Sequence, residues 1–582
     1  MKKRILIFLL IFMATKQVVF SQETTTVYYQ KALKERVFVH YNSSFFVTGE
    51  KLYYKVYCIR ARNNQLSNFS KVAYVELINA EKQVLFKHKV RLEKGVGNGA
   101  FFLPTSIPSG NYKLIAYTQW MRNEGGKSFF KGDITLVNTF QEDQFFNNKE
   151  PLQAVVKTTP VSSQKHIKIK ATNSKKPIQL TLKKTTYKNR EKVVVKLTSS
   201  APSHTFGNYS ISVRKIDSFR QSVKLTPKTY LNAYSETGSV IKKMKANFLP
   251  ELKGDVLMGK VVHSATGIPV KGVKVVLSIP NKKFKFRFAI TNDLGVFKFV
   301  FKTPHEDAEA VIQIVDAEKE KYKIKVFKQE PLKYKTLVFH PIEISSKTKK
   351  QLLEYSIQNQ IENMYAEVKQ DERLKTTITT PQFDNSRLYL LDDYTRFSTL
   401  KETILEIVKN VWISKKNKKY TFHVKNSDVY DEEKELPLVI VDGVFIQNHD
   451  EIVDFSAYKI KTISVVREKY LYGSYVFQGI VLIETFKGDY KKNETTAYLQ
   501  NIHFDVPSIN KYFYTQRYYN DTFDRIPDYR RQLLWMPTFD FKTNETTVDF
   551  YTSDVVGDFE IIVEGFNQKG APVSLRTFFS VE

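Results

Sequence analysis

The chain of 582 residues contains 90 Lys and Arg residues and 60 Asp and Glu residues, which gives a formal net charge of +30 at pH 7. Because domains usually contain ~100–200 residues, we expect roughly three to five of them. The one cysteine, Cys58, excludes an intrachain disulfide, so hydrophobic cores must hold the domains together. The charge favours polyanionic partners. The lysines are dispersed through strand-like runs, however, where they are ordinary solvent-facing residues.

Residues 1–21 have the features of a secretory signal peptide. Lys2, Lys3 and Arg4 form a basic start, and the apolar run 5–13 is shorter than the ~20 residues that a membrane helix needs. Cleavage is expected before Gln22, and no later segment is apolar for long enough to span a bilayer as a helix. We therefore expect export and a mature chain without a transmembrane span.

Glycine turns followed by strand-like runs characterise residues 22–145. Gly49 permits a tight turn before a paired strand, and residues 108–112 form a turn that leads into an alternating strand over 112–117. This pattern resembles the β-sandwich found second in alpha-2-macroglobulin chains. Because the chain lacks the Gly-Cys-Gly-Glu-Gln run of the macroglobulin thioester, the resemblance implies the scaffold alone.

Residues 160–245 repeat the same theme and predict a second sandwich. The run 187–197 is similar to the start of the strand at 48–57 in the first module, and Gly207 opens another alternating strand over 207–213.

Residues 250–330 predict a third sandwich. The segments 259–262, 267–273 and 291–297 resemble the carboxypeptidase regulatory-like domain, a non-catalytic, transthyretin-like sandwich of about seven strands, with Gly295 at a positive φ in a hairpin turn. Residues 283–288 alternate aromatic and basic side chains, which predicts a half-buried strand. Such a face could stack nucleic-acid bases only beside a groove that tracks their backbone. We therefore expect no nucleic-acid partner.

Helical periodicity is confined to three segments. A strand at 334–339 and a linker helix are expected within 331–375, and the helix has one apolar stripe formed by Leu353, Ile357, Ile361, Met364 and Val368. Residues 400–411 predict a second helix, which Thr399 and Glu402 cap in capping-box spacing. A short third helix is expected at 450–455.

Residues 376–490 contain the most specific pattern of the chain. Two apolar strands flank Asp442-Gly443, a strand at 463–466 follows, and a Tyr-Gly turn precedes the glycine-led strand 479–485. This order resembles the plug domain of TonB-dependent outer-membrane receptors, which a carboxypeptidase regulatory-like domain often precedes. The 97 residues after Thr485 are too few for a barrel of about 20 strands, each of which needs ~10 residues. We therefore expect a plug without its pore, and residues 467–471 are bulkier and more charged than in receptors.

The resemblance to a plug implies a docking site for a protein partner in the outer membrane or periplasm. Its candidate residues are Asp442, Gly443, Tyr472, Gly473 and Gly479. The localisation that it implies is periplasmic or outer-membrane-associated.

Residues 500–582 end in three predicted strands at 546–551, 559–563 and 573–579. Three strands cannot bury a sandwich core alone. We expect them to pair with the strand at 334–339 and to complete a fourth sandwich, into which the plug-like segment is inserted.

Motifs for chemistry are missing from the sequence. No two of the ten histidines lie within five residues of each other, so the His-x₃-His spacing of a helical metal site is absent. The chain also lacks a Gly-x-Ser-x-Gly elbow and a phosphate-binding Gly-x₄-Gly-Lys-Ser/Thr loop. Cys58 lies in a strand-like run and is expected to be a buried core residue. We therefore predict no catalytic residue, no metal and no cofactor.

The predicted fold is mainly β: tandem immunoglobulin- or macroglobulin-like and transthyretin-like sandwiches with a small α/β plug-like domain. The predicted function is that of a non-catalytic multidomain envelope protein that docks a partner through the plug-like module, in an outer-membrane transport or assembly complex. Two alternatives stay open. One is a surface protein that binds anionic glycans, lipopolysaccharide or lipid head groups through its charge, and the other is a glycan-acting enzyme with sandwich appendages.

Overall fold

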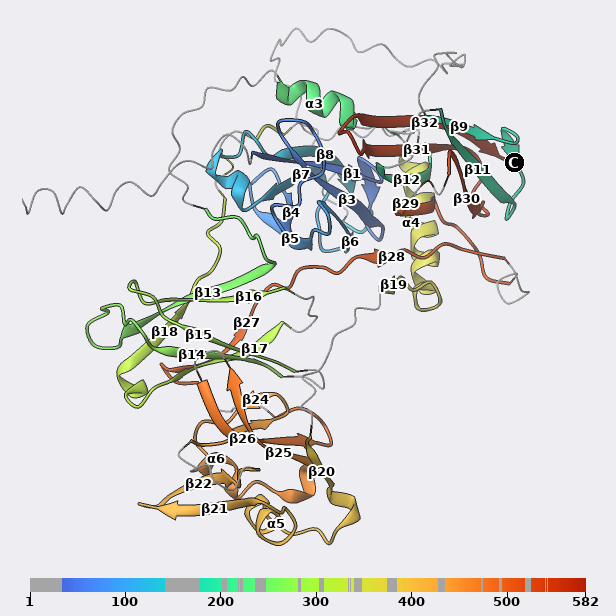
Figure 1. The fold of residues 1–582 in the computed structure, drawn as a ribbon. Coiled ribbons are helices and arrows are strands. Elements are labelled where there is room, and N and C mark those ends of the chain that lie inside the picture. The colour runs from blue at the N-terminus through green and yellow to red at the C-terminus, as the bar shows by residue number, and fades with distance from the viewer. Residues whose placement is uncertain are drawn as a thin grey trace, which may run out of the picture. The chain divides into compact units, whose positions relative to one another are not determined.

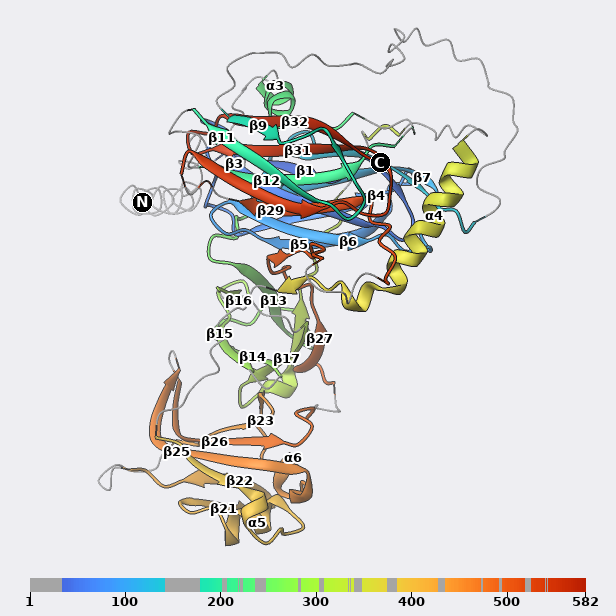
Figure 2. The ribbon, with the colours of Figure 1, turned by 90° about the vertical axis from the view of Figure 1, so that its right-hand side faces the viewer.

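The chain forms two compact units, each made from separate stretches of sequence. Unit 1 comprises residues 1–252, 333–374 and 508–582, and unit 2 comprises residues 253–332 and 375–507. The computed structural model (Figures 1 and 2) describes residues 34–141, 178–200, 207–217, 219, 223–235, 248–280, 284–302, 308–332, 334, 337–339, 348–373, 385–427, 435–472, 475–490, 495–518, 525–539, 541 and 543–582. The predicted signal peptide lies outside these residues. Strands dominate both units, which confirms the mainly β fold class.

Sandwich 1 of unit 1 consists of a three-stranded and a five-stranded sheet. The first sheet has the order β1 (Glu35–Tyr41), β3 (Lys51–Arg60), β6 (Val96–Phe102). The second has the order β2 (Phe45–Val47), β8 (Phe130–Val137), β7 (Gly110–Thr118), β4 (Val72–Ile78), β5 (Val84–Arg91), and the turn η1 (Trp120–Asn123) follows β7. The core contains the predicted Cys58, which is fully buried in β3.

Sandwich 2 of unit 1 combines strands from the middle and the end of the chain. Its five-stranded sheet has the order β10 (Thr186–Tyr187), β32 (Pro572–Val581), β31 (Gly557–Asn567), β12 (Gly207–Lys215), β29 (Gln532–Phe539). Its three-stranded sheet has the order β30 (Glu545–Tyr551), β11 (Lys192–Ser199), β9 (Ile178–Leu182). Side chains from both stretches share one hydrophobic core, which covers the apolar face that neither stretch could bury alone.

The three C-terminal strands therefore have different partners from the predicted ones. They complete the second sandwich, and the expected fourth sandwich with 334–339 is not formed. Tyr334 instead donates its hydroxyl hydrogen to Glu76 of β4 in sandwich 1. Lys113 of β7 lies 5.9 Å from the ring centre of Phe339. Tyr334 and Phe339 belong to no strand, and both contact sandwich 1 through their side chains.

The linker helix forms, but a different face of it is buried. Helix α4 spans Lys349–Met364 and is followed by η5 (Ala366–Val368). Its buried residues are Leu352, Tyr355, Ser356 and Asn359, whereas Leu353 and Met364 of the predicted stripe are 57% and 78% exposed. This buried face contributes Leu352 and Tyr355 to a hydrophobic cluster with strands β2 and β8. It also carries a polar contact, because Arg214 of β12 donates to the Tyr355 hydroxyl at 2.6 Å and to Glu50 at 2.7 Å.

Two smaller elements complete unit 1. Helix α3 spans Pro227–Ser235 and places Tyr230 against Phe38 of sandwich 1, with ring centres 5.5 Å apart. The short strands β19 (Glu372–Arg373) and β28 (Lys511–Tyr512) pair with each other.

Sandwich 3 lies in unit 2. One sheet has the order β16 (Val296–Phe301), β13 (Asp255–His263), β18 (Tyr322–Val326), with η3 (Lys319–Lys321) before β18. The other has the order β15 (Lys285–Ile290), β14 (Lys274–Ile279), β17 (Glu309–Val315), β27 (Leu499–His503). β27 follows the rest of unit 2 in sequence and lies beside β17 (Figure 2). Gly295 has the predicted positive φ, at 70°.

The α/β part of unit 2 is a five-stranded sheet with short helices. Its order is β20 (Arg387–Leu390), β25 (Ile460–Tyr472), β26 (Tyr475–Thr485), β23 (Leu438–Val441), β24 (Val444–Phe445), with β23 parallel to β26. The remaining elements are η6 (Leu391–Asp393), α5 (Leu400–Glu406), the hairpin β21 (Val411–Lys416) and β22 (Lys419–Val424), α6 (Asp450–Val453) and η7 (Ala457–Lys459). Thr399 and Glu402 form the predicted capping box of α5.

The two faces of this sheet pack against different partners. One face packs on α5, α6 and the β21–β22 hairpin. The other packs on aromatic side chains of sandwich 3, among them Phe284 and Phe286. None of the helices in the described part of the chain is long and apolar enough to cross a membrane.

Candidate binding cleft

The predicted docking residue Asp442 has a buried carboxylate with three hydrogen bonds. It accepts from the backbone amide of Thr485 at 2.8 Å, from the Thr485 hydroxyl at 2.6 Å and from the amide of Tyr490 at 3.1 Å. Asp442 has a positive φ of 45°, a conformation that Asp and Asn tolerate better than most residues. Its side chain thus fixes the segment after β26 to the turn between β23 and β24.

Gly443 allows this turn to approach sandwich 3 closely. Its φ is +86°, and a Cβ atom there would overlap the Cβ of Phe284. Two hydrogen bonds hold the same junction inside unit 2. Phe445 donates its amide to the Ser278 hydroxyl at 3.2 Å, and Gln313 donates to the Phe445 carbonyl at 2.9 Å.

The other predicted docking residues also have internal partners. Gly479 has a φ of +78°, and a Cβ there would lie 2.6 Å from the Val466 carbonyl oxygen. Tyr472 donates its hydroxyl hydrogen to the Phe286 carbonyl at 2.9 Å. Gly473 lies outside the described residues. The four described candidates therefore make contacts inside unit 2.

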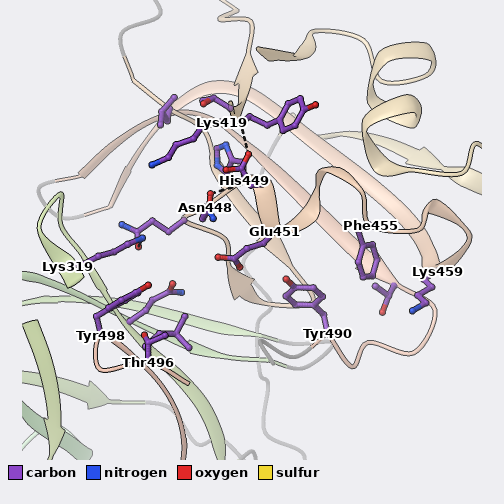
Figure 3. A pocket seen from close by; sticks show the side chains of 18 of the residues that line it. Lys319, Lys419, Asn448, His449, Glu451, Phe455, Lys459, Tyr490, Thr496 and Tyr498 are labelled. Atoms are coloured by element: carbon purple, nitrogen blue, oxygen red, sulfur yellow. Dashed lines mark hydrogen bonds between the residues drawn. The ribbon is translucent and has the colours of Figure 1, made fainter. Parts of the chain in front are cut away.

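A cleft of about 1310 Å³ opens beside the Asp442 turn. Its walls are the connection between β17 and β18, the segment from β24 through η7, the start of β22, and the residues that follow β26 (Figure 3). No local sequence pattern predicts this cleft, because its walls come from segments that are far apart in the chain.

The charges that line the cleft nearly balance, in contrast to the +30 of the whole chain. The basic residues are Lys319, Lys419, Lys459 and Lys487, and the acidic residues are Asp316, Glu320, Asp450, Glu451 and Asp489. Lys319 donates to the Gln447 side chain at 3.2 Å and lies 5.4 Å from the ring centre of Tyr498. This contact links sandwich 3 to the α/β part along one wall.

Aromatic side chains supply the apolar surface of the cleft. Tyr458 and Phe486 are 60% and 50% exposed. Phe455 and Tyr490 meet edge to face, with ring centres 5.8 Å apart (Figure 3). Burial raises the pKa of Tyr490 to about 12, so its hydroxyl stays protonated and can donate a hydrogen bond. Rigid aromatic rings offer contact area at a low cost in conformational entropy.

His449 at the N-terminus of α6 has a structural role. Its Nδ1 accepts the backbone amide of Phe422 at 2.9 Å. Burial, reinforced by the neighbouring His423, lowers the pKa of His449 to about 4, although Asp450 opposes this shift. Asp450 itself accepts the Tyr420 amide at 2.6 Å. Both polar groups therefore hold β22 against α6, and the imidazole is neutral near pH 7. Among the described residues, no group of His, Cys, Asp and Glu side chains could hold a metal ion.

No family model matches the chain, and no curated protein is similar to it in sequence. Among solved structures, it is similar to Salmonella alpha-2-macroglobulin reacted with methylamine, at 10% identity over 94% of this chain and 40% of that chain, with a TM-score of 0.22. It is similar to Escherichia coli alpha-2-macroglobulin activated by porcine elastase, at 11% identity over 94% of this chain and 44% of that chain, with a TM-score of 0.23. The Yersinia pseudotuberculosis adhesin InvE matches 50% of this chain and 57% of its own at 8% identity, with a TM-score of 0.13.

This chain thus spans less than half the length of those macroglobulins. TM-scores this low establish neither a shared fold nor a shared function.

Proposed function

We propose that this protein is a non-catalytic, multidomain envelope protein whose unit 2 docks a partner polypeptide in the cleft. The observation that carries the proposal is the lining of the cleft. Balanced charges and exposed aromatic rings suit a polypeptide segment, which carries both charge signs and apolar side chains. A polyanionic ligand would favour an excess of lysines there.

The fixed geometry of the walls supports docking without large rearrangement. The Asp442 carboxylate holds the segment after β26, and the Lys319–Gln447 bond holds the wall from sandwich 3. A preorganised surface loses little conformational entropy when its partner binds. The resemblance of 376–490 to a receptor plug and the basic, apolar start of the chain favour a partner in the periplasm or outer membrane.

Site-specific photocrosslinking in cells tests the proposal. A photoreactive amino acid replaces Tyr458 or Phe486 in the cleft, and the matched control replaces Tyr394, which is also exposed but does not line the cleft. We expect both cleft positions, but not the control, to give the same protein adduct. The proposal is wrong if the cleft positions give no adduct or give the same adducts as the control.

A second candidate function is the binding of a glycan by the same part of unit 2. Trp412 of β21 is exposed and stacks on His423, with ring centres 5.1 Å apart and planes at 13°. The same hairpin contributes Lys419 and Thr421 to the cleft. Stacked, exposed aromatic rings are suited to sugar faces. Titration of Trp412 fluorescence with neutral and anionic oligosaccharides tests this function, and an unchanged signal with both would exclude it.

A further inference from the structure

One sheet of sandwich 3 has a basic outer face. Along β13, β16 and β18, alternate residues point into the core, among them Leu257, Val261, Phe297, Phe299 and Ile324. The residues between them point outward. These outward residues include Met258, Lys260, Lys298, Lys323 and Lys325, and Phe327 follows β18 on the same side. We call this surface the lysine face.

Strand register brings the four lysines close together. Lys260 is directly opposite Lys325 in the β13–β18 pair. Lys323 and Lys298 occupy the diagonal positions next to Lys260, because they pair with Val262 and Met258 respectively. Directly opposed residues have Cβ atoms about 5 Å apart and diagonal ones about 7–8 Å, and like charges at such positions are destabilising.

Nothing in the described part of the chain neutralises this charge. The four lysines make no ion pair there, whereas the nearby Lys271 and Lys321 pair with Asp293 and Glu318. β16 and β18 contain no acidic residue, and the one acidic residue of β13, Asp255, is buried. A sheet that keeps opposed lysines without a counter-charge is suited to an external anion.

Two exposed apolar side chains lie among these lysines. Met258 and Phe327 are 39% and 45% exposed, and they are neighbours because the Phe327 amide donates to the Met258 carbonyl at 2.9 Å. A soluble polyanion would gain little from them. A lipid surface would accept both groups, since lysines reach head-group phosphates while apolar side chains enter the boundary with the acyl chains.

We propose that the lysine face binds the surface of a membrane that contains anionic phospholipids. Lys260, Lys298, Lys323 and Lys325 contact the phosphates, and Met258 and Phe327 insert between the head groups. The proposal is independent of the docking cleft, because none of these six residues lines it.

The first test measures co-sedimentation of the full chain with vesicles of phosphatidylcholine, with and without phosphatidylglycerol. We expect binding only when phosphatidylglycerol is present, with a steep dependence on salt. The double variant K260Q/K325Q should reduce partitioning by roughly 25-fold, since each lysine near an anionic surface contributes about fivefold. The control K409Q/K461Q changes the charge equally at exposed positions of unit 2 outside this face. An equal loss in the control would show that net charge alone binds vesicles, and the proposal would fail.

The second test separates a membrane from a soluble polyanion. The variant M258S/F327S keeps every lysine and removes the apolar groups. We expect it to lose vesicle binding while its retention on a heparin column stays unchanged. If vesicle binding also stays unchanged, the face is a site for soluble polyanions and the membrane proposal is overturned. Thermal unfolding verifies that each variant is folded, and crosslinking at Phe486 should be unaffected throughout.

Discussion

The Asp442 carboxylate accepts both the backbone amide and the hydroxyl of Thr485, at 2.8 and 2.6 Å. It also accepts the amide of Tyr490, so all of its bonded donors come from the segment that follows β26 or from its last residue. The Asp442 carboxylate therefore holds Thr485 and Tyr490, two residues that line this side of the cleft, in place.

The variant Asp442→Asn tests this anchor. Asn tolerates the positive φ of the site, so backbone strain stays nearly constant. Its NH₂ group, however, takes the place of one carboxylate oxygen. It therefore faces a hydrogen-bond donor, from which that oxygen accepts in the unchanged protein. We expect a loss of about 1–3 kcal/mol in the free energy of unfolding of unit 2, measured by urea titration. The exposed Asp393→Asn serves as the control and should change stability little.

Gly443 offers a test of the junction between the α/β part and sandwich 3. Gly443→Ala introduces both a positive-φ strain and an overlap with Phe284. Gly267→Ala is the matched control, because Gly267 has a φ of +71° and no atom within 4 Å of the added Cβ. Strain alone costs about 1–2 kcal/mol. We expect Gly443→Ala to destabilise unit 2 clearly more than the control does, and equal effects would contradict the close approach.

The buried contact of Arg214 with Glu50 and Tyr355 predicts unequal effects of two substitutions. Arg214→Met leaves the Glu50 carboxylate buried and without its cation, so we expect a loss of about 3–5 kcal/mol in the stability of unit 1. Tyr355→Phe removes one acceptor and should cost only about 1 kcal/mol. Chemical denaturation monitored for unit 1 compares them. Similar costs would show that the ion pair contributes no more than the hydroxyl does.

The pH dependence of unit 1 should reveal Glu564. Burial raises the pKa of this carboxyl to about 8 from an ordinary 4.5, although Lys224 opposes the shift. The folded chain thus binds the proton more tightly than the unfolded chain, and the free energy of unfolding falls as the pH rises from about 4.5 to about 8. Gln resembles the protonated form, so Glu564→Gln should stabilise unit 1 above pH 8 and have little effect below pH 4.5.

A neighbouring group acts in the opposite direction at acidic pH. Burial lowers the pKa of His40, whose Nε2 lies 3.8 Å from Glu564 Oε2. The unfolded chain then binds a proton at His40 more tightly than the folded chain, so the free energy of unfolding falls as the pH falls below 6.5. Above pH 6.5, His40 is neutral in both proteins, and the difference between Glu564→Gln and the unchanged chain there isolates the carboxyl. A difference that does not vary with pH would refute the assignment.

Local signals predicted local structure well. Three features are predictable from the sequence because each depends on neighbours within a few positions: the capping box of Thr399 and Glu402, the positive φ of Gly295 and the strand character of the C-terminal residues. The pairing of strands is not predictable in this way. Val195 of β11 pairs with Val548 of β30, and no short-range pattern encodes a partner at that distance in the chain.

The candidate site shows the same division. Two adjacent residues are enough to predict the Asp442-Gly443 turn. The inward direction of the Asp442 carboxylate is not predictable from them, because its partners Thr485 and Tyr490 belong to a later segment of the chain. On α4, apolar periodicity predicted the helix but selected the wrong face. The buried face instead contributes Leu352 and Tyr355 to a cluster with residues of sandwich 1, and Tyr355 accepts from the buried Arg214, so partners distant in sequence select the face.

Sandwich 2 has consequences for the order of synthesis. Strands β9, β11 and β12 leave the ribosome several hundred residues before β29–β32, which supply their hydrogen-bonding neighbours. Until then they present open edges that invite aggregation. Most of unit 2 is synthesised in this interval. All of its described strands are available for pairing once β27 has been synthesised. A nascent chain of this design therefore gains from a chaperone that shields the early edges until translation is almost finished.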